Sequence, residues 1–305
     1  LSSSSAASDV YKRQVQYRLM QKQFQQLLPD SLIPRRFPIG EETVIRSAKR
    51  ERFVDFYQRY YTPERMTLVI IGDCDPAVME QRVNATFATM PIPKVAGTNP
   101  DMGQVNPLKA IQTAVFADSE VTSTELSMIA LRPYQLKPDT RSERVALLPL
   151  TLANSILSRR FDRLAKRENA AILGGSASRD VIFNQIEMAH VEVTVKDTDW
   201  QNALPVLEQE QRRARLHGFT NAELEEAKAL MINQYEQAVQ TARTRKSDAL
   251  ATAVARSISD ESVFSTPQTD LDIVRTALAE ITPASCHRAF NACLLYTSPS
   301  PRDRG

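Results

Sequence analysis

Residues 51–73 read ERFVDFYQRYYTPERMTLVIIGD, and this stretch decides the fold. An aromatic stripe recurs at three- and four-residue steps before Pro63, and its members are Phe53, Phe56, Tyr57 and Tyr60. This spacing predicts a helix whose stripe packs in the core. The β-branched run Met66–Ile71 follows and ends at Gly72-Asp73, which predicts a buried strand. The stretch therefore predicts a helix that leads directly into a strand of a mixed fold.

The segments on either side of this stretch predict helices and one linker. A Gln-rich stretch from Val15 to Leu28 predicts a helix. Asp75-Pro76 predicts the capped start of another helix, with Met79, Val83, Phe87 and Met90 on its apolar side. Proline and glycine crowd the region around residues 93–109, which contains few large apolar residues, so a linker between two lobes is predicted there.

The second part of the chain predicts strands followed by many helices. Strands are expected at Ala110–Ala117 and Ser123–Leu131, before a long helix from Thr140 to Lys166. A later strand alternates Val191, Val193 and Val195 with polar residues, which indicates one buried and one wetter sheet face. Thr220–Glu223 is a capping-box pattern, and helices are expected on both sides of it and up to the last one after Pro283. The predicted fold class is α+β, with helices packed on one face of a mainly antiparallel sheet.

Both ends of the chain are expected to be non-native. Back-translation of Asp9–Gln14 gives DNA whose reverse complement, shifted by one base, encodes Cys293–Ser298. That DNA resembles a transposon adapter used in sequencing libraries. We therefore expect residues 1–14 and 293–305 to be adapter-like, and we leave them out of the fold prediction.

Composition excludes several classes of protein. The chain is 42% hydrophobic and 24% charged, values typical of a globular protein, and its net charge is +2. Such a balance gives no case for a nucleic-acid or membrane-surface partner. No apolar run reaches the roughly 18 residues that span a bilayer. Without the suspected adapter, Cys74 and Cys286 remain, and they form neither a zinc motif nor a disulfide framework.

Several elements in a fixed order carry a resemblance to a known family. In the first part they are Arg36-Phe37-Pro38-Ile39-Gly40, Glu42, Ile45, Phe56-Tyr57, Tyr61–Met66 and Val69–Asp73. This order resembles the second half of the catalytic domain in the insulinase/pitrilysin family of zinc metallopeptidases. There, an R-x-PIG loop precedes a helix ending in FY-x-x-x-Y-x-P and a strand ending in GD. Arg159–Glu168 and Gly218–Lys228 resemble two helical segments of the family's next lobe.

The resemblance implies two similar α+β lobes that close on a peptide. Residues 15–92 would be the C-terminal part of the catalytic (N-terminal) lobe, and residues 110–292 a near-complete second lobe. The family binds Zn²⁺ through an HxxEH helix whose glutamate is the general base, and this helix precedes the R-x-PIG loop. The histidines of this chain are His190, His217 and His287, and none lies in HxxEH. We therefore predict no catalytic residue and no metal ligand here, and expect this internal fragment to bind no zinc and to be inactive alone.

The resemblance assigns a structural role to the loop Arg36, Pro38, Ile39 and Gly40, near the active cleft. Gly40 is expected to adopt a backbone conformation that a side chain would forbid. His190 and Glu192 share one side of a strand and could supply two metal ligands, but a third is not evident, so a sheet-surface pair is the favoured interpretation. Two further patterns are interpreted as structural, namely Cys286-His287 and the basic cluster Arg212, Arg213 and Arg215 near a helix end.

The leading functional hypothesis is that the intact parent is a zinc metalloendopeptidase acting on peptides or small unfolded polypeptides. The substrate would be held as an added strand on a sheet edge. A second peptidase-family half is expected in the parent chain or as a partner subunit, and a periplasmic location is implied by the resemblance alone. One alternative is a non-catalytic scaffold or presenting subunit with an apolar assembly surface. Another is an unrelated peptide-binding α+β protein.

Overall fold

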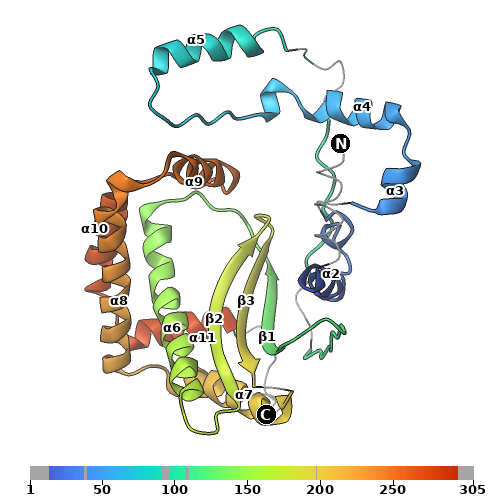
Figure 1. Cartoon of the computed structure of the whole chain (residues 1–305). Coiled ribbons are helices and arrows are strands. Elements are labelled where there is room, and N and C mark those ends of the chain that lie inside the picture. The colour runs from blue at the N-terminus through green and yellow to red at the C-terminus, as the bar shows by residue number, and fades with distance from the viewer. Residues whose placement is uncertain are drawn as a thin grey trace.

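The computed structural model describes residues 14–37, 40–90, 92, 97–106, 110–196 and 198–294. Two parts are visible in Figure 1. A lobe runs from residue 124 to the end of the described chain, and a segment that we call the arm, residues 40–90, extends away from it. The chain is therefore a mixed α and β protein, as predicted, with its sheet in the lobe.

The sheet contains β1 (Thr124–Pro133), β2 (Ile172–Ile182) and β3 (Ile186–Val195), in the order β1-β3-β2. Both pairs are antiparallel. Along β3 every second side chain from Glu187 to Val195 is buried, and the intervening ones from Met188 to Thr194 are half-buried. The alternation of Val191, Val193 and Val195 with polar residues predicted one buried and one wetter sheet face, and this prediction is confirmed.

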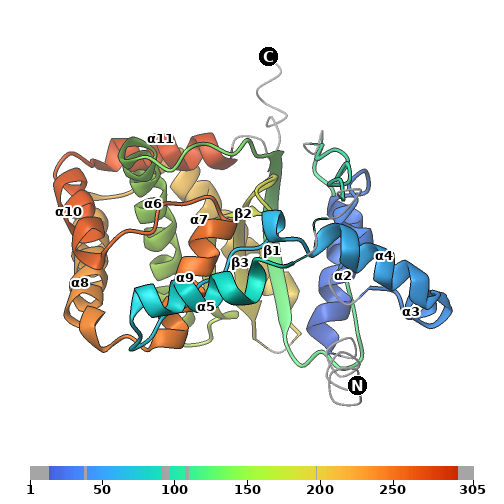
Figure 2. The same ribbon diagram turned by 90° about the horizontal axis from the view of Figure 1, so that it is seen from above.

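The helices of the lobe lie on one side of this sheet. They are α6 (Arg141–Ala165), α7 (Trp200–His217), α8 (Asn221–Gln240), α9 (Ser247–Ser259), α10 (Pro267–Leu278) and α11 (Pro283–Leu294). Leu152, Leu157 and Phe161 of α6 lie at helical spacing and are fully buried in the cluster that includes Val191 and Val193. Of these helices, α6 and α7 contact the strands, and α8 and α10 pack against α6. Figure 2 shows the sheet between α6 and the first helix of the described chain.

Local signals in the sequence determine where these helices begin and end. The Thr140 side chain caps α6, and Thr220 forms a complete capping box with Glu223 at the start of α8. Gly218 ends α7 with φ +68°, a conformation that favours glycine. The predicted helix boundaries in this part of the chain are confirmed to within a few residues.

The N-terminal part contains α2 (Val15–Leu27), η1 (Ile33–Arg35), α3 (Glu42–Ser47), α4 (Arg50–Tyr60), η2 (Pro63–Arg65) and α5 (Pro76–Phe87). Asp75 caps α5 as expected, because its carboxylate accepts the N–H groups of Ala77 and Val78. Leu32 N donates to Met102 O at 2.8 Å, and Ser31 bridges Gly103. The chain therefore leaves for the arm and returns from it at the same place.

Two predictions about the arm are wrong. The aromatic stripe of α4 does not pack in a core, because Phe53, Phe56 and Tyr57 are each more than half exposed. Met66–Ile71 is not a strand; among the described residues none of its backbone groups joins a sheet, and Leu68 is 55% exposed. A strand forms only where a neighbour takes its hydrogen bonds, and no described strand pairs with this segment.

The strand expected at Ala110–Ala117 is also wrong. This segment is irregular, with Ile111 and Val115 exposed, and it runs along α2, where Arg18 binds Asp118 and Lys22 Nζ reaches Ala117 O at 3.4 Å. Residues 110–115 are exposed, so their backbone groups can bond to water and need no sheet neighbour. The sequence pattern alone could not show that difference.

Candidate functional site

The face of the sheet that no layer of helices covers is the candidate site, and we call it the open face. The strand register places on it Glu125, Ser127, Ile129, Leu131 and Pro133 of β1; Ile186, Met188, His190, Glu192 and Thr194 of β3; and Gly174, Ser176, Ser178, Asp180 and Ile182 of β2. The ionisable groups among these residues are three carboxylates and one imidazole. None of these strand residues is Lys or Arg, so the open face is anionic.

Apolar contacts close one half of the open face. Leu131 and Ile186 are buried there against Leu28 and Ile33, which lie at and after the end of α2. The other half is polar and contains His190 and Glu192, so two chemically distinct halves share one sheet surface. We call this second half the polar half.

His190 lies at the centre of the polar half. Its Nδ1 is 3.6 Å from an Asp180 carboxylate oxygen, and its Nε2 is 4.0 Å from a Glu192 oxygen. Ser178 Oγ donates to Asp180 at 2.5 Å and lies 3.3 Å from both ring nitrogens, while Ser176 Oγ donates to Glu192 at 3.0 Å. The imidazole is therefore flanked on both sides by carboxylates and hydroxyls.

This arrangement does not build a catalytic triad. Ser178 already donates its proton to Asp180, and its Oγ is equidistant from the two ring nitrogens of His190, so no single ring nitrogen is aligned to take that proton. The group can instead bind a ligand by charge and hydrogen bonds.

The same geometry argues against a metal ion. Asp180 and Glu192 approach opposite ring nitrogens of His190, so the three groups do not converge on one point. Zinc needs three or four converging ligands. Within the described ranges no group of three His, Cys, Asp or Glu residues could hold a metal, so these residues do not fit zinc.

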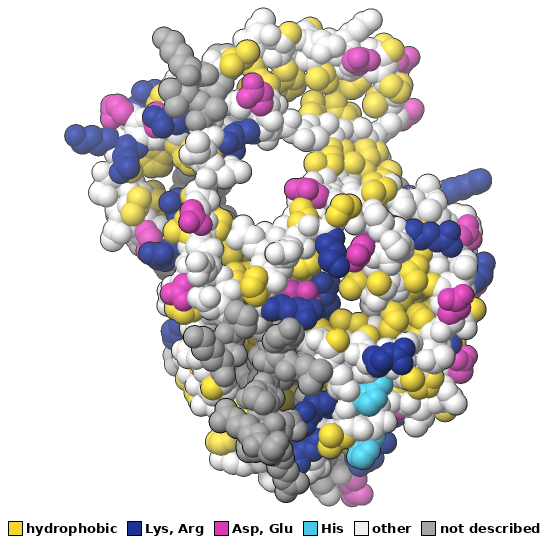
Figure 3. Space-filling model, turned by 180° about the vertical axis from the view of Figure 1, so that it is seen from behind, with side chains coloured by type: hydrophobic (Ala, Val, Ile, Leu, Met, Phe, Trp, Pro, Cys, Tyr) yellow, Lys and Arg dark blue, Asp and Glu magenta, His cyan; other side chains and the backbone are white. Residues whose placement is uncertain are grey.

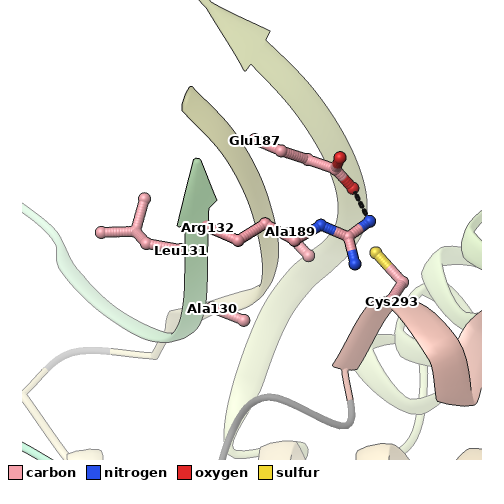
Figure 4. A pocket seen from close by; sticks show the side chains of 6 residues that line it. All are labelled: Ala130, Leu131, Arg132, Glu187, Ala189 and Cys293. Atoms are coloured by element: carbon pink, nitrogen blue, oxygen red, sulfur yellow. Dashed lines mark hydrogen bonds and ion pairs between the residues drawn. The ribbon is translucent and has the colours of Figure 1, made fainter. Parts of the chain in front are cut away.

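A buried ion cluster lies on the helix-covered face, at the end of the sheet (Figure 4). Arg132 and Arg179 both bind Glu187, with Arg179 Nε 2.9 Å from its carboxylate. Burial acts to raise the pKa of Glu187, but the hydrogen bonds from Arg179 and Arg132 prevail and hold that pKa below its usual value. These cations are therefore engaged on the face opposite to the polar half.

Cys293 of α11 lines the small depression beside this cluster together with Ala130, Leu131 and Ala189. Its side chain is buried, and burial raises the pKa of its thiol. The predicted adapter-like tail begins at this residue and, from residue 295 on, lies outside the described chain.

The loop singled out by the resemblance is described only at its edges. Arg36 follows η1 and is exposed, and Gly40 adopts φ +69°, so the expected glycine conformation is confirmed. Pro38 and Ile39 lie outside the described residues. The supporting role of this loop near a cleft stays a prediction.

The remaining sequence candidates are structural. Cys286 is fully buried, which raises the pKa of its thiol to about 11. His287 Nε2 lies 2.7 Å from the carbonyl oxygen of Arg215, a contact that ties α11 to the end of α7. Arg212 and Arg213 each pair with a glutamate one turn away on α7. Cys286 is packed as expected, whereas His287 is half-buried against α7 and is not the surface residue that was predicted.

The sequence pointed to His190 and Glu192 but missed Asp180, Ser178 and Glu125. Asp180 and Ser178 could have been found from the alternation after Gly174, where Ser176, Ser178 and Asp180 occupy every second position of β2. Which strand lies beside which is not readable from such a pattern. Only the register brings Ser178 opposite His190.

An antiparallel sheet with one helix-covered and one open face places this lobe in the α+β class. The chain belongs to the M16 peptidase family, because the family model described as the Peptidase M16 inactive domain matches residues 47–231. The predicted resemblance to insulinase-type peptidases is confirmed by this match.

Three comparisons, with two proteins, show the extent of the similarity. The probable zinc protease PqqL of Escherichia coli (strain K12) is 23% identical over 253 residues, which are 82% of this chain and 27% of the relative. The crystal structure of the periplasmic protease PqqL from Escherichia coli matches with a TM-score of 0.84 at 19% identity, over 95% of this chain and 32% of that one. A predicted insulinase family protease from Yersinia pestis matches with a TM-score of 0.71 at 17% identity, over 93% of this chain and 59% of that one.

The chain thus spans between a quarter and a third of the length of PqqL. At these identities the structural matches establish the fold of the lobe. They do not transfer the activity of the larger proteins.

Proposed function

We propose that this chain is part of a zinc-dependent metalloendopeptidase and contributes a wall of its peptide-binding chamber. The observation that carries the proposal is the polar half of the open face, where hydrogen-bonding side chains of all three strands are partly exposed. Membership of the M16 family and the zinc protease names of the relatives support it. The substrate class we infer is peptides and small unfolded polypeptides.

The chain's own residues would bind and orient polypeptide rather than cleave it. The described residues do not fit zinc, so the metal and the general base would belong to another part of the parent protein. In this proposal Arg36, Pro38, Ile39 and Gly40 support the wall of the active cleft. Residues 15–92 would complete a catalytic lobe, with residues 93–109 as the linker to the second lobe.

The partner in this proposal is a second peptidase-family half, in the same chain or as a separate subunit. PqqL from Escherichia coli is a periplasmic protease, and we infer the same location for the parent of this chain. Among the described residues, no helix is both long and apolar enough to cross a bilayer.

The test is to purify the product of the uninterrupted gene and to measure its zinc content and its cleavage of an unfolded polypeptide. Stoichiometric zinc and chelator-sensitive cleavage are expected. A full-length protein with neither would contradict the peptidase function. The chain described here serves as the control and should bind no zinc after dialysis.

The exposed surface of the arm favours a second candidate, a scaffold or presenting subunit. Hydrophobic side chains gather on the arm around the opening that separates it from the lobe (Figure 3). Phe53, Phe56 and Tyr57 of α4 present an apolar surface that suits assembly with another polypeptide. The scaffold function predicts a stable complex with an active partner, together with the absence of zinc from the full-length protein.

A further inference from the structure

We propose that the polar half of the open face binds extended polypeptide segments rich in lysine or arginine. The inference rests on the proposed function, because it names the chemical class of polypeptide that this wall would prefer.

Charge is the first argument. Glu125, Asp180 and Glu192 lie on the open face, and all three side chains are partly or largely exposed. The arginines of the same strands point the other way, where Arg132 and Arg179 are engaged by Glu187. No cation of the sheet therefore neutralises these carboxylates from the same side, and a ligand that supplies cations gains their attraction.

Spacing is the second argument. The carboxylates come from all three strands. Asp180 of β2 lies opposite Met188 of β3, Glu192 is in β3 itself, and Glu125 of β1 lies opposite Thr194 of β3. They span about 20 Å along the strand direction, given about 3.3 Å per residue. An extended peptide places alternate side chains on one side at twice that rise, so cationic residues at every second position can reach successive carboxylates. Ser127 and His190 supply additional hydrogen-bonding groups between them.

The test uses the full 305-residue chain and short labelled peptides in which Ala alternates with Lys, Glu or Gln. Fluorescence anisotropy at low salt measures each dissociation constant. We expect the Lys peptide to bind most tightly and to weaken as salt rises. The double variant Asp180→Asn/Glu192→Gln should weaken the Lys peptide about fivefold, as two exposed ion pairs would.

The matched control is Glu225→Gln/Asp272→Asn. This control also removes two negative charges, but from α8 and α10, which lie on the far side of α6 (Figure 1). It should leave the affinity for the Lys peptide unchanged. Equal binding of the Lys and Glu peptides by the unchanged chain would overturn the inference without any variant. So would an equal effect of the two double variants, or tight binding of Ca²⁺ that displaces the Lys peptide.

A cross-linking experiment distinguishes this inference from the proposed function. The variant Ser127→p-benzoylphenylalanine places a photoreactive group on the exposed part of the open face. Capture of the Lys peptide in preference to the Gln and Glu peptides supports both proposals. Capture of all peptides alike overturns the charge preference but leaves a peptide-binding wall. Capture of none contradicts the wall itself.

Discussion

Arg160 and Glu223 form a two-point ion pair in the interior of the lobe. Arg160 Nε and Nη2 lie 2.7 and 2.9 Å from the two carboxylate oxygens of Glu223, and both side chains are at least seven-eighths buried. The same glutamate completes the capping box with Thr220. One contact therefore joins the C-terminal part of α6 to the first turn of α8.

Loss of one partner should destabilise the lobe strongly. In Arg160→Leu the carboxylate of Glu223 stays buried without its cation, so we expect a loss of about 3 kcal/mol in the free energy of unfolding. Urea unfolding followed by circular dichroism measures it. The control is Arg163→Gln on the same helix, whose side chain is 53% exposed and should cost under about 1 kcal/mol. Equal losses for the two variants would contradict a special role for Arg160.

The same pair makes stability depend on pH in the acid range. Hydrogen bonds from Arg160, opposed by burial and assisted by the Thr220 N–H, lower the pKa of Glu223 to about 2. Since the folded pKa lies below the unfolded one, the folded state binds fewer protons, and this stability is present above about pH 4.5 and lost as the pH falls toward 2.

The expected contribution of Glu223 is of the order of 3 kcal/mol. Unfolding curves of the unchanged chain and of Glu223→Gln, collected from pH 6 to 2 in steps, measure it. The difference in stability between the two proteins should shrink as the pH falls. A constant difference over this range would show that Glu223 does not titrate as argued.

Neighbouring glycines of β2 should respond very differently to alanine. A Cβ at Gly175 would lie 2.7 Å from the carbonyl oxygen of Glu192 and 2.9 Å from the Phe161 ring, whereas a Cβ at Gly174 meets nothing within 4 Å. Gly175→Ala should therefore cost roughly 2 kcal/mol through overpacking. Gly174→Ala should lie within about 0.5 kcal/mol of the unchanged chain. Thermal unfolding of the pair tests this, and equal effects would contradict the close approach of α6 to β2.

Two phenylalanines test the difference between the arm and the lobe. Phe161 is fully buried, so Phe161→Ala should cost about 3 to 5 kcal/mol. Phe56 is 54% exposed, and Phe56→Ser should change the unfolding of the lobe by less than about 0.5 kcal/mol. Binding of an apolar dye to the folded chain should fall in Phe56→Ser. A large loss of stability in that variant would mean that α4 is packed in solution.

The sequence predicted those elements whose signal is local. The long helix with Leu152 and Leu157, the alternation at Val191 and the capping box at Thr220 each depend on residues a few positions apart, and each is confirmed. These signals suffice for the helix-covered half of the lobe. The apolar spacing among them also marks the residues that lie in the buried core.

The predictions that were wrong depend on what lies opposite a segment. The pattern of Phe53, Phe56 and Tyr57 correctly gave a helix, but burial requires a surface facing it, and none is present among the described residues. Met66–Ile71 has the composition of a strand and lacks a neighbour among the residues that the structure describes. The candidate site was only half visible for the same reason, because Asp180 joins His190 through strand register and not through spacing in the chain.

The bridge between Ser31 and Gly103 has a consequence for how the molecule could vary. Since the chain departs and returns at this bridge, the arm is joined to the rest of the chain between two neighbouring backbone positions. Its length, sequence and docking partner could drift without moving a strand. The arm could thus change in evolution while the side chains of the open face stayed the same.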